Sequence, residues 1–169
     1  GDLMKAPILP GKYQVTATTE INASQKDVWQ LLQDFSNVEW APGVNKSYHI
    51  GHEEKGIGAG RHCELDGFGE IDEYITQWHE GTGYVYNVSA LGPLHQAISS
   101  WWLSSKHGKT TLTVVFSYNI RFGLFGKIMH KLIMRNKLEK SLPLTLAGVK
   151  NEMNKVPQKL SALNEGLAG

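Results

Sequence analysis

Between residues 46 and 121 the sequence contains six consecutive β-strand patterns and no helical pattern. The expected strands cover residues 46–53, 59–65, 70–79, 83–90, 96–105 and 110–121. The segments between them are short and rich in Gly, Pro, Asp or Lys, which is typical of turns between antiparallel neighbours. In the last strand Leu112, Val114 and Phe116 alternate with polar residues, so we expect a sheet with one covered and one wetter face.

A further strand and a short helix precede this run. Residues 13–21 alternate between apolar and polar types with period two, which predicts a half-buried strand. Ser24 occupies the N-cap position of a helix, with Asp27 three residues later, and Val28 begins its apolar face. A turn or second helix is expected at residues 38–40, giving two short helices after the first strand.

One long helical pattern follows the strands. Its apolar positions run from Ile128 to Met153, and Pro143 within it predicts a kink or break near residues 139–143. We divide the chain into a lead at 1–11, a domain at 12–153 and a tail at 154–169, which ends in glycine-rich sequence and is expected to be partly ordered. The sheet has to curl around the long helix, because no other element is large enough to bury its inner face. The expected class is α+β, and such a curled sheet tends to leave a gap beside the helix.

Four local motifs resemble one superfamily. They are TEINASQKDVW (residues 19–29), FSNVEWAPGV (35–44), Gly60-Arg61 followed by Glu73-Tyr74-Ile75, and Gly108-Lys109-Thr110 before the last strand. Together with the order of elements, they resemble the helix-grip SRPBCC/START-like superfamily, which includes birch-pollen-allergen-like proteins. The likeness is nearest to its polyketide cyclase/dehydrase-like branch. The resemblance covers about residues 12–153 and implies a helix-grip fold, in which seven antiparallel strands curl around a long C-terminal helix.

Arg61 and Glu73 are the candidate catalytic pair. Arg61 shares its strand phase with Cys63, and Glu73 lies on the next expected strand. If the two pair, they form a structural tie; an unpaired Arg61 would instead anchor a carboxylate, phosphate or enolate oxygen. The resemblance implies a cyclase or dehydratase role, in which Arg61 stabilises an enolate and Glu73 or Tyr86 moves the proton.

Aromatic side chains on the expected sheet suggest a ligand pocket. Flat, polar-tipped rings suit the walls of such a pocket, although each ring could equally fill the core. Adjacent Trp101 and Trp102 must point to opposite faces, so one of them is expected to be exposed or covered by a partner. The candidate ligand-binding residues are Trp40, Arg61, Cys63, Tyr86, Trp101, Phe116 and Tyr118.

No motif for a metal or cofactor is visible. The seven histidines are scattered, no histidine–carboxylate cluster is expected, and His130 is expected to lie on a solvated face. The segment 56–60 joins two strands instead of opening a helix, so no dinucleotide cofactor is expected. No membrane span or signal peptide is visible, so a cytoplasmic location is expected. A monomer or a homodimer is expected.

Charge divides unevenly along the chain. Residues 1–90 carry 13 acidic and 6 basic side chains, whereas residues 91–169 carry 11 basic and 3 acidic ones. The basic excess at Lys127, Lys131, Arg135, Lys137 and Lys140 is either a patch for anionic lipid or nucleic acid, or a solvated helix face. No nucleic-acid motif accompanies these charges, so no nucleic-acid partner is expected.

Three functions remain open from the sequence. The first is binding of a small hydrophobic or amphipathic ligand, such as a lipid, isoprenoid or polyketide-like molecule, in a cavity between the sheet and the last helix. The second, implied by the resemblance, is a polyketide cyclase/dehydratase-like enzyme. The third is a protein- or membrane-interaction module that uses the basic last helix.

Overall fold

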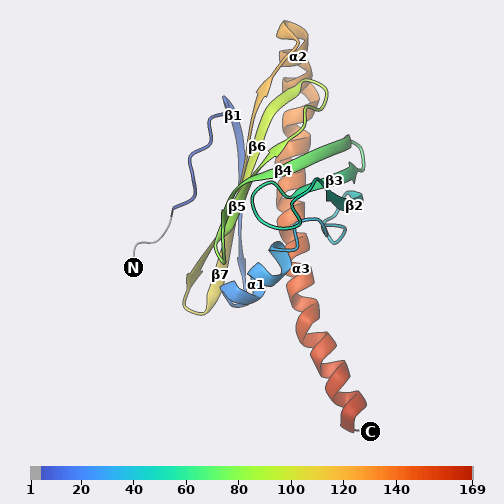
Figure 1. Cartoon of the computed structure of the whole chain (residues 1–169). Helices are drawn as coiled ribbons and strands as arrows, with labels where there is room; N and C mark the ends of the chain where they lie inside the picture. The colour runs from blue at the N-terminus through green and yellow to red at the C-terminus, as the bar shows by residue number, and fades with distance from the viewer. Residues whose placement is uncertain (1–4, 169) are drawn as a thin grey trace.

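The structure, a computed structural model, describes the backbone of residues 5–168 and the side chains of residues 5–155. Seven strands form one antiparallel sheet in the order β1-β7-β6-β5-β4-β3-β2 (Figure 1). The strands are β1 (Tyr13–Ile21), β2 (Val44–Ile50), β3 (Gly60–Leu65), β4 (Gly69–His79), β5 (Gly83–Val88), β6 (Leu94–Lys106) and β7 (Lys109–Ile120). The predicted class, an α+β helix-grip fold with seven strands and a long C-terminal helix, is confirmed.

One helix, α1 (Gln25–Leu32), follows β1. Its N-cap is Ser24, whose Oγ accepts the Asp27 backbone N–H at 3.1 Å. The alternative of a second helix at residues 38–40 is wrong, because the chain there makes single turns, such as the Ala41 N–H to Val38 oxygen bond of 3.0 Å. Pro42 lacks an N–H and Gly43 has a φ of +86°, so these turns cannot extend into a helix.

The C-terminal segment is helical from Gly123 onward. It comprises α2 (Gly123–Met129), a π-helical turn η1 (His130–Met134) and α3 (Arg135–Ala168). The expected break at Pro143 does not occur. Ser141 and Thr145 donate their hydroxyl groups to the carbonyl oxygens of Leu138 and Ser141, at 3.3 and 3.1 Å, as the helix passes the proline. The helix also includes residues 154–168, which were expected to form a separate, partly ordered tail.

The helix covers only part of the inner face of the sheet. α3 packs mainly against β1, which is one of the two edge strands of the sheet. The main core cluster contains Leu146, Val149 and Met153 of α3, packed with α1 and the central strands. A separate cluster of Val38, Cys63 and Ile71, toward the β2 edge, contains no α3 residue among the described side chains. Space therefore remains between α3 and this part of the sheet.

The outer face of the sheet is partly covered by the chain itself. The backbone N–H of Gly11 donates to Ser117 Oγ at 2.7 Å, and the nearby Leu9 is buried. Trp101 faces the core, while Trp102 is buried on the outer face, with its ring centroid 5.1 Å from that of His79. The expectation that one of these tryptophans is exposed or covered by a partner is therefore wrong.

Candidate ligand-binding cavity

A cavity of about 170 Å³ lies where α3 leaves the sheet uncovered. Its floor is the inner face of β3 to β7, one wall is the loop before β2, and the other wall is α3. This loop can approach α3 closely because residue 148 is glycine: a Cβ there would lie 2.7 Å from Pro42 Cδ. Lining residues from the loop, the sheet and the helix include Val38, Trp40, Ala41, Val44, Cys63, Ile71, Phe116, Leu138, Ser141, Leu142 and Thr145.

A second cavity of about 120 Å³ adjoins the first. The two cavities have several lining side chains in common: Leu65, Ile71, Glu73, Phe116, Leu138 and Ser141. The second one continues toward Leu91 and Leu94, at the end of the sheet where β5 turns into β6.

A buried ion pair forms the polar part of the cavity wall. Arg61 and Glu73 are opposite each other on β3 and β4, and Arg61 Nε donates to Glu73 Oε1 at 2.8 Å. A second guanidinium nitrogen donates to the Phe35 carbonyl oxygen at 2.8 Å. The guanidinium carbon lies 4.0 Å from the Phe35 ring centroid and 4.9 Å from that of Tyr86. Both side chains of the pair are buried, and this geometry supports the structural-tie alternative.

The titratable groups around this pair are held in their unreactive forms. Burial alone lowers the pKa of Arg61, but the charge of Glu73, followed by Tyr86 and Tyr84, raises it above its usual value. Burial, the largest cause, raises the pKa of the Cys63 thiol to about 12. Burial also raises the pKa of Tyr86, whose hydroxyl accepts a hydrogen bond from Trp101 Nε1 at 3.0 Å. At neutral pH, Cys63 is therefore a thiol and Tyr86 a neutral phenol.

The structure brings most of the predicted site residues together at this cavity. The residues that line it are Trp40, Arg61, Cys63, Glu73, Tyr86, Trp101 and Phe116. Tyr118 is not among the lining residues, and its hydroxyl oxygen lies 2.6 Å from His130 Nε2 instead. The last helix was expected to border the cavity, but its lining residues were not predicted, although Ser141 and Thr145 are polar residues four apart within an apolar helical stripe.

Trp40 supplies the one unpaired donor in the described cavity wall. Its Nε1 atom is buried and has no hydrogen-bond partner among the described residues. A buried indole N–H without an acceptor is unfavourable, because the hydrogen bond that it made to water in the unfolded chain is lost. An oxygen atom of a bound molecule would satisfy it.

These features can be compared with known proteins. The family profile described as polyketide cyclase/dehydrase and lipid transport matches residues 12–154. The chain belongs to this family. A comparison with curated proteins gave no significant match.

Several solved structures have the same fold as this chain, although their sequence identity to it is low. A protein of Thermus thermophilus matches with a TM-score of 0.71 and 15% identity, covering 85% of this chain and 99% of its own. A START superfamily protein of Mycobacterium smegmatis matches with a TM-score of 0.66 and 12% identity, covering 85% and 98%. At such identities, the likeness supports the fold and not a particular ligand.

His130 lies in a buried aromatic cluster in this family member, and the expectation of a solvated position is wrong. Its ring centroid is 4.5 Å from that of Tyr13 and 5.4 Å from that of Tyr118. The side chain is buried although Lys127 and Lys131 on either side of it are exposed, because the helix turns His130 toward β1 and β7. Burial, followed by the charge of Arg135, lowers the pKa of His130.

A lowered His130 pKa predicts acid sensitivity. Below the ordinary value of 6.5, the unfolded chain takes up a proton that the folded imidazole resists, so stability is lost as the pH falls. Between about pH 8 and pH 5.5 we therefore expect the parent to lose stability relative to His130→Gln; the raised pKa of His62 acts in the opposite direction, but equally in both proteins. Urea denaturation across this range measures both slopes. Equal slopes in the two proteins would contradict the prediction.

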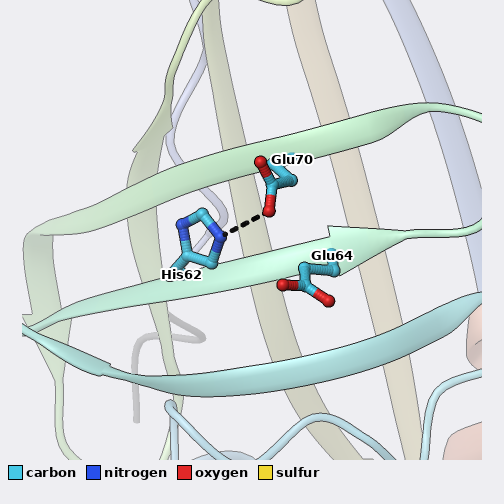
Figure 2. Close-up of side chains that lie close together, drawn as sticks. All are labelled: His62, Glu64 and Glu70. Atoms are coloured by element: carbon cyan, nitrogen blue, oxygen red, sulfur yellow. Dashed lines mark ion pairs between the residues drawn. The ribbon is translucent and has the colours of Figure 1, made fainter.

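The family fold also brings together a histidine–carboxylate cluster on the outer face of β3 and β4. The ligand atoms of His62, Glu64 and Glu70 lie within 4.8 Å of one another (Figure 2), so the expectation that no such cluster forms is wrong. His62 Nδ1 is 2.6 Å from Asp72 Oδ1 and Nε2 is 3.5 Å from Glu70 Oε1. The bond to Asp72, the largest cause, raises the pKa of His62. Imidazole and carboxylate groups are suitable ligands for divalent metals, and here His62 pairs with Asp72 and Glu70.

Proposed function

We propose that the protein binds a small, largely apolar molecule with one hydrogen-bond acceptor in the cavity between the sheet and α3. The observation that supports this most is a cavity wall of mostly apolar and aromatic side chains that contains, among the described residues, a single unpaired donor, Trp40 Nε1. Ligand sites in proteins have this composition: mostly apolar surface with a few polar groups that fix orientation. The family description, which includes lipid transport, is consistent with such a ligand.

The binding proposal accounts for the cavity residues better than a cyclase mechanism. A cyclase would require Arg61 to face the substrate oxygen and a second group to accept a proton. Here Arg61 already pairs with Glu73 at 2.8 Å and with the Phe35 carbonyl group. Cys63 and Tyr86 have raised pKa values, so neither is ionised near neutral pH. We therefore assign Arg61 and Glu73 to the wall of the site and not to catalysis.

Filling the cavity is expected to abolish binding. Ser141 lines both cavities, so the aromatic ring in Ser141→Phe would occupy the space of the ligand. We expect affinity to fall at least about tenfold. The probe is 1-anilinonaphthalene-8-sulfonate fluorescence, competed by fatty acids, isoprenols and polycyclic aromatic compounds. The matched control, Ala147→Phe, adds the same ring at an exposed position of α3. Equal competition curves for both variants would refute the proposal, and urea denaturation checks that each is folded.

Trp40→Phe tests the polar part of the same site. This change keeps an aromatic wall and removes the Nε1 donor. The affinity of competitors that carry a hydrogen-bond acceptor should therefore fall about three- to tenfold, while the affinity of hydrocarbons should not change. Trp78→Phe is the control, because the Trp78 indole N–H donates to Glu80 at 2.7 Å and does not line the cavity. An equal loss for both kinds of competitor would show that Trp40 contributes packing alone.

A further inference from the structure

Large apolar side chains gather on the surface where β7 passes into the C-terminal helix. We call Phe122, Leu124, Phe125, Ile128, Leu132 and Ile133 the apolar tip. Leu124, Phe125 and Leu132 are 74%, 68% and 71% exposed. Figure 1 shows α2 at one end of the molecule, far from α1 and from the C-terminal end of α3. Single exposed apolar residues are ordinary, but six of them between residues 122 and 133 at a projecting end of the molecule point to an interaction surface.

Basic side chains run beside the apolar tip. Leu124, Ile128 and Leu132 recur every four residues, as do Lys127, Lys131 and Arg135, so two adjacent stripes follow the helix. Acidic side chains are absent from the sequence between Glu80 and Glu139. Among the described ion pairs, Arg135 bonds to Glu139 at 2.8 Å, whereas none involves Lys127 or Lys131. The surface is thus apolar and positively charged.

The backbone holds Phe122 at the tip at an energetic cost. Phe122 has a φ of +71°, in the left-handed region that bulky residues rarely adopt, and its side chain is 56% exposed. The Arg121 guanidinium carbon lies 4.6 Å from the centroid of its ring. Neither local geometry nor core packing favours an exposed aromatic side chain in this conformation. Strained residues of this kind cluster at functional sites.

We propose that this end of the molecule docks on an anionic lipid bilayer. The apolar tip enters the boundary between headgroups and acyl chains, and Lys127 and Lys131 contact lipid phosphates. Aliphatic and aromatic side chains beside lysines are the composition of helices that lie at membrane surfaces. Charge complementarity favours an anionic bilayer over a second copy of the chain, because two copies of this tip would repel each other. None of the described helices is long and apolar enough to cross a membrane.

Docking in this way places the second cavity close to the lipid. Leu138, which lines both cavities, follows Leu132 on the same helical segment by about 9 Å. Near the same place, Lys137 Nζ donates to the Gly67 carbonyl oxygen at 3.2 Å and lies 5.4 Å from the ring centroid of Phe68. The docking proposal stands independently of the ligand-binding proposal. A Ser141→Phe protein with a filled cavity should bind vesicles like the parent.

Vesicle flotation tests the docking. The probes are vesicles of phosphatidylcholine alone and with about 30% phosphatidylserine, at about 50 mM and about 500 mM NaCl. We expect binding to the anionic vesicles at low salt, with weaker binding at high salt or to phosphatidylcholine. Lys127→Gln with Lys131→Gln should reduce partitioning roughly fivefold per lysine. Leu124→Ser with Phe125→Ser should reduce it at least about tenfold.

Matched controls separate the tip from general charge and hydrophobicity. Lys26→Gln with Lys106→Gln removes the same charge at exposed sites away from α2, and Ile8→Ser with Ile57→Ser removes two exposed apolar side chains elsewhere. Both controls should bind vesicles like the parent. Equal losses in tip and control variants would overturn the proposal, as would absence of binding to anionic vesicles at low salt. Dimerisation abolished by the tip variants, or RNA binding without vesicle binding, would also overturn it by assigning the surface to another partner.

Discussion

Arg61→Met is expected to lower the free energy of unfolding by about 3–5 kcal/mol, because it leaves the Glu73 carboxylate buried without its partner. The two side chains are 5% and 6% exposed, and their atoms are 2.8 Å apart. Methionine replaces most of the stem of arginine, so the lost volume is small and the effect comes mainly from the unpaired charge. The bond to the Phe35 carbonyl oxygen disappears as well. Urea denaturation of both proteins at pH 7 measures the difference.

A second variant separates an unpaired charge from a general packing defect. In Arg61→Met with Glu73→Leu, both charges are absent and two apolar side chains occupy their place. Replacing a buried ion pair by apolar residues is often neutral or stabilising, so the double variant should recover most of the loss. A loss below about 1 kcal/mol in the single variant would contradict the structural-tie assignment. A double variant as unstable as the single one would attribute the effect to packing.

Leu146→Ala is expected to cost about 2–5 kcal/mol, because it empties a site at the centre of the contact between α3 and the sheet. Leu146 is 2% exposed and belongs to the main core cluster with Val149 and Met153. This contact holds the helix over the sheet and so maintains the cavity beside it. Thermal and urea denaturation give the magnitude.

Leu144 provides a matched control two residues away on the same helix. Its side chain is 57% exposed, so Leu144→Ala removes the same atoms from the surface and should change stability by no more than about 0.5 kcal/mol. Similar losses of stability at both positions would contradict the orientation of α3, in which Leu146 faces the sheet and Leu144 faces solvent. A large loss at Leu144 alone would place the opposite face of the helix against the core.

The strands and the first helix of this protein could be predicted because the sequence patterns that specify them are local. Alternation with period two identifies the inward residues of β7, such as Val114 and Phe116, without knowledge of their neighbours. Ser24 and Asp27 identify the start of α1 in the same way. The boundary of β2 was less well predicted: the strand ends at Ile50 because Gly51 has a φ of +87°, a choice that composition alone does not reveal.

The site could be predicted only in part. Strand phase placed Arg61 and Cys63 on one face of the sheet without saying which face, and the structure shows that this face, together with Glu73, lines the cavity. Phase does not say whether an inward side chain meets the cavity or another side chain, and Tyr118 meets His130. Similarly, the histidine–carboxylate cluster contains residues from two strands. It forms only because the strand register places Glu64 opposite Glu70.

Sequence by itself determined the seven strands, the long helix and which residues of a strand share a face, because periodicity and turn chemistry act over a few residues. Tertiary structure alone decided that α3 packs near β1 and leaves the β3 side open, which creates the cavity. It also decided that His130 is buried while the apolar tip around it is exposed. The physical reason is that burial depends on which surfaces meet, and a helix with apolar residues on several faces does not specify which one the sheet will cover.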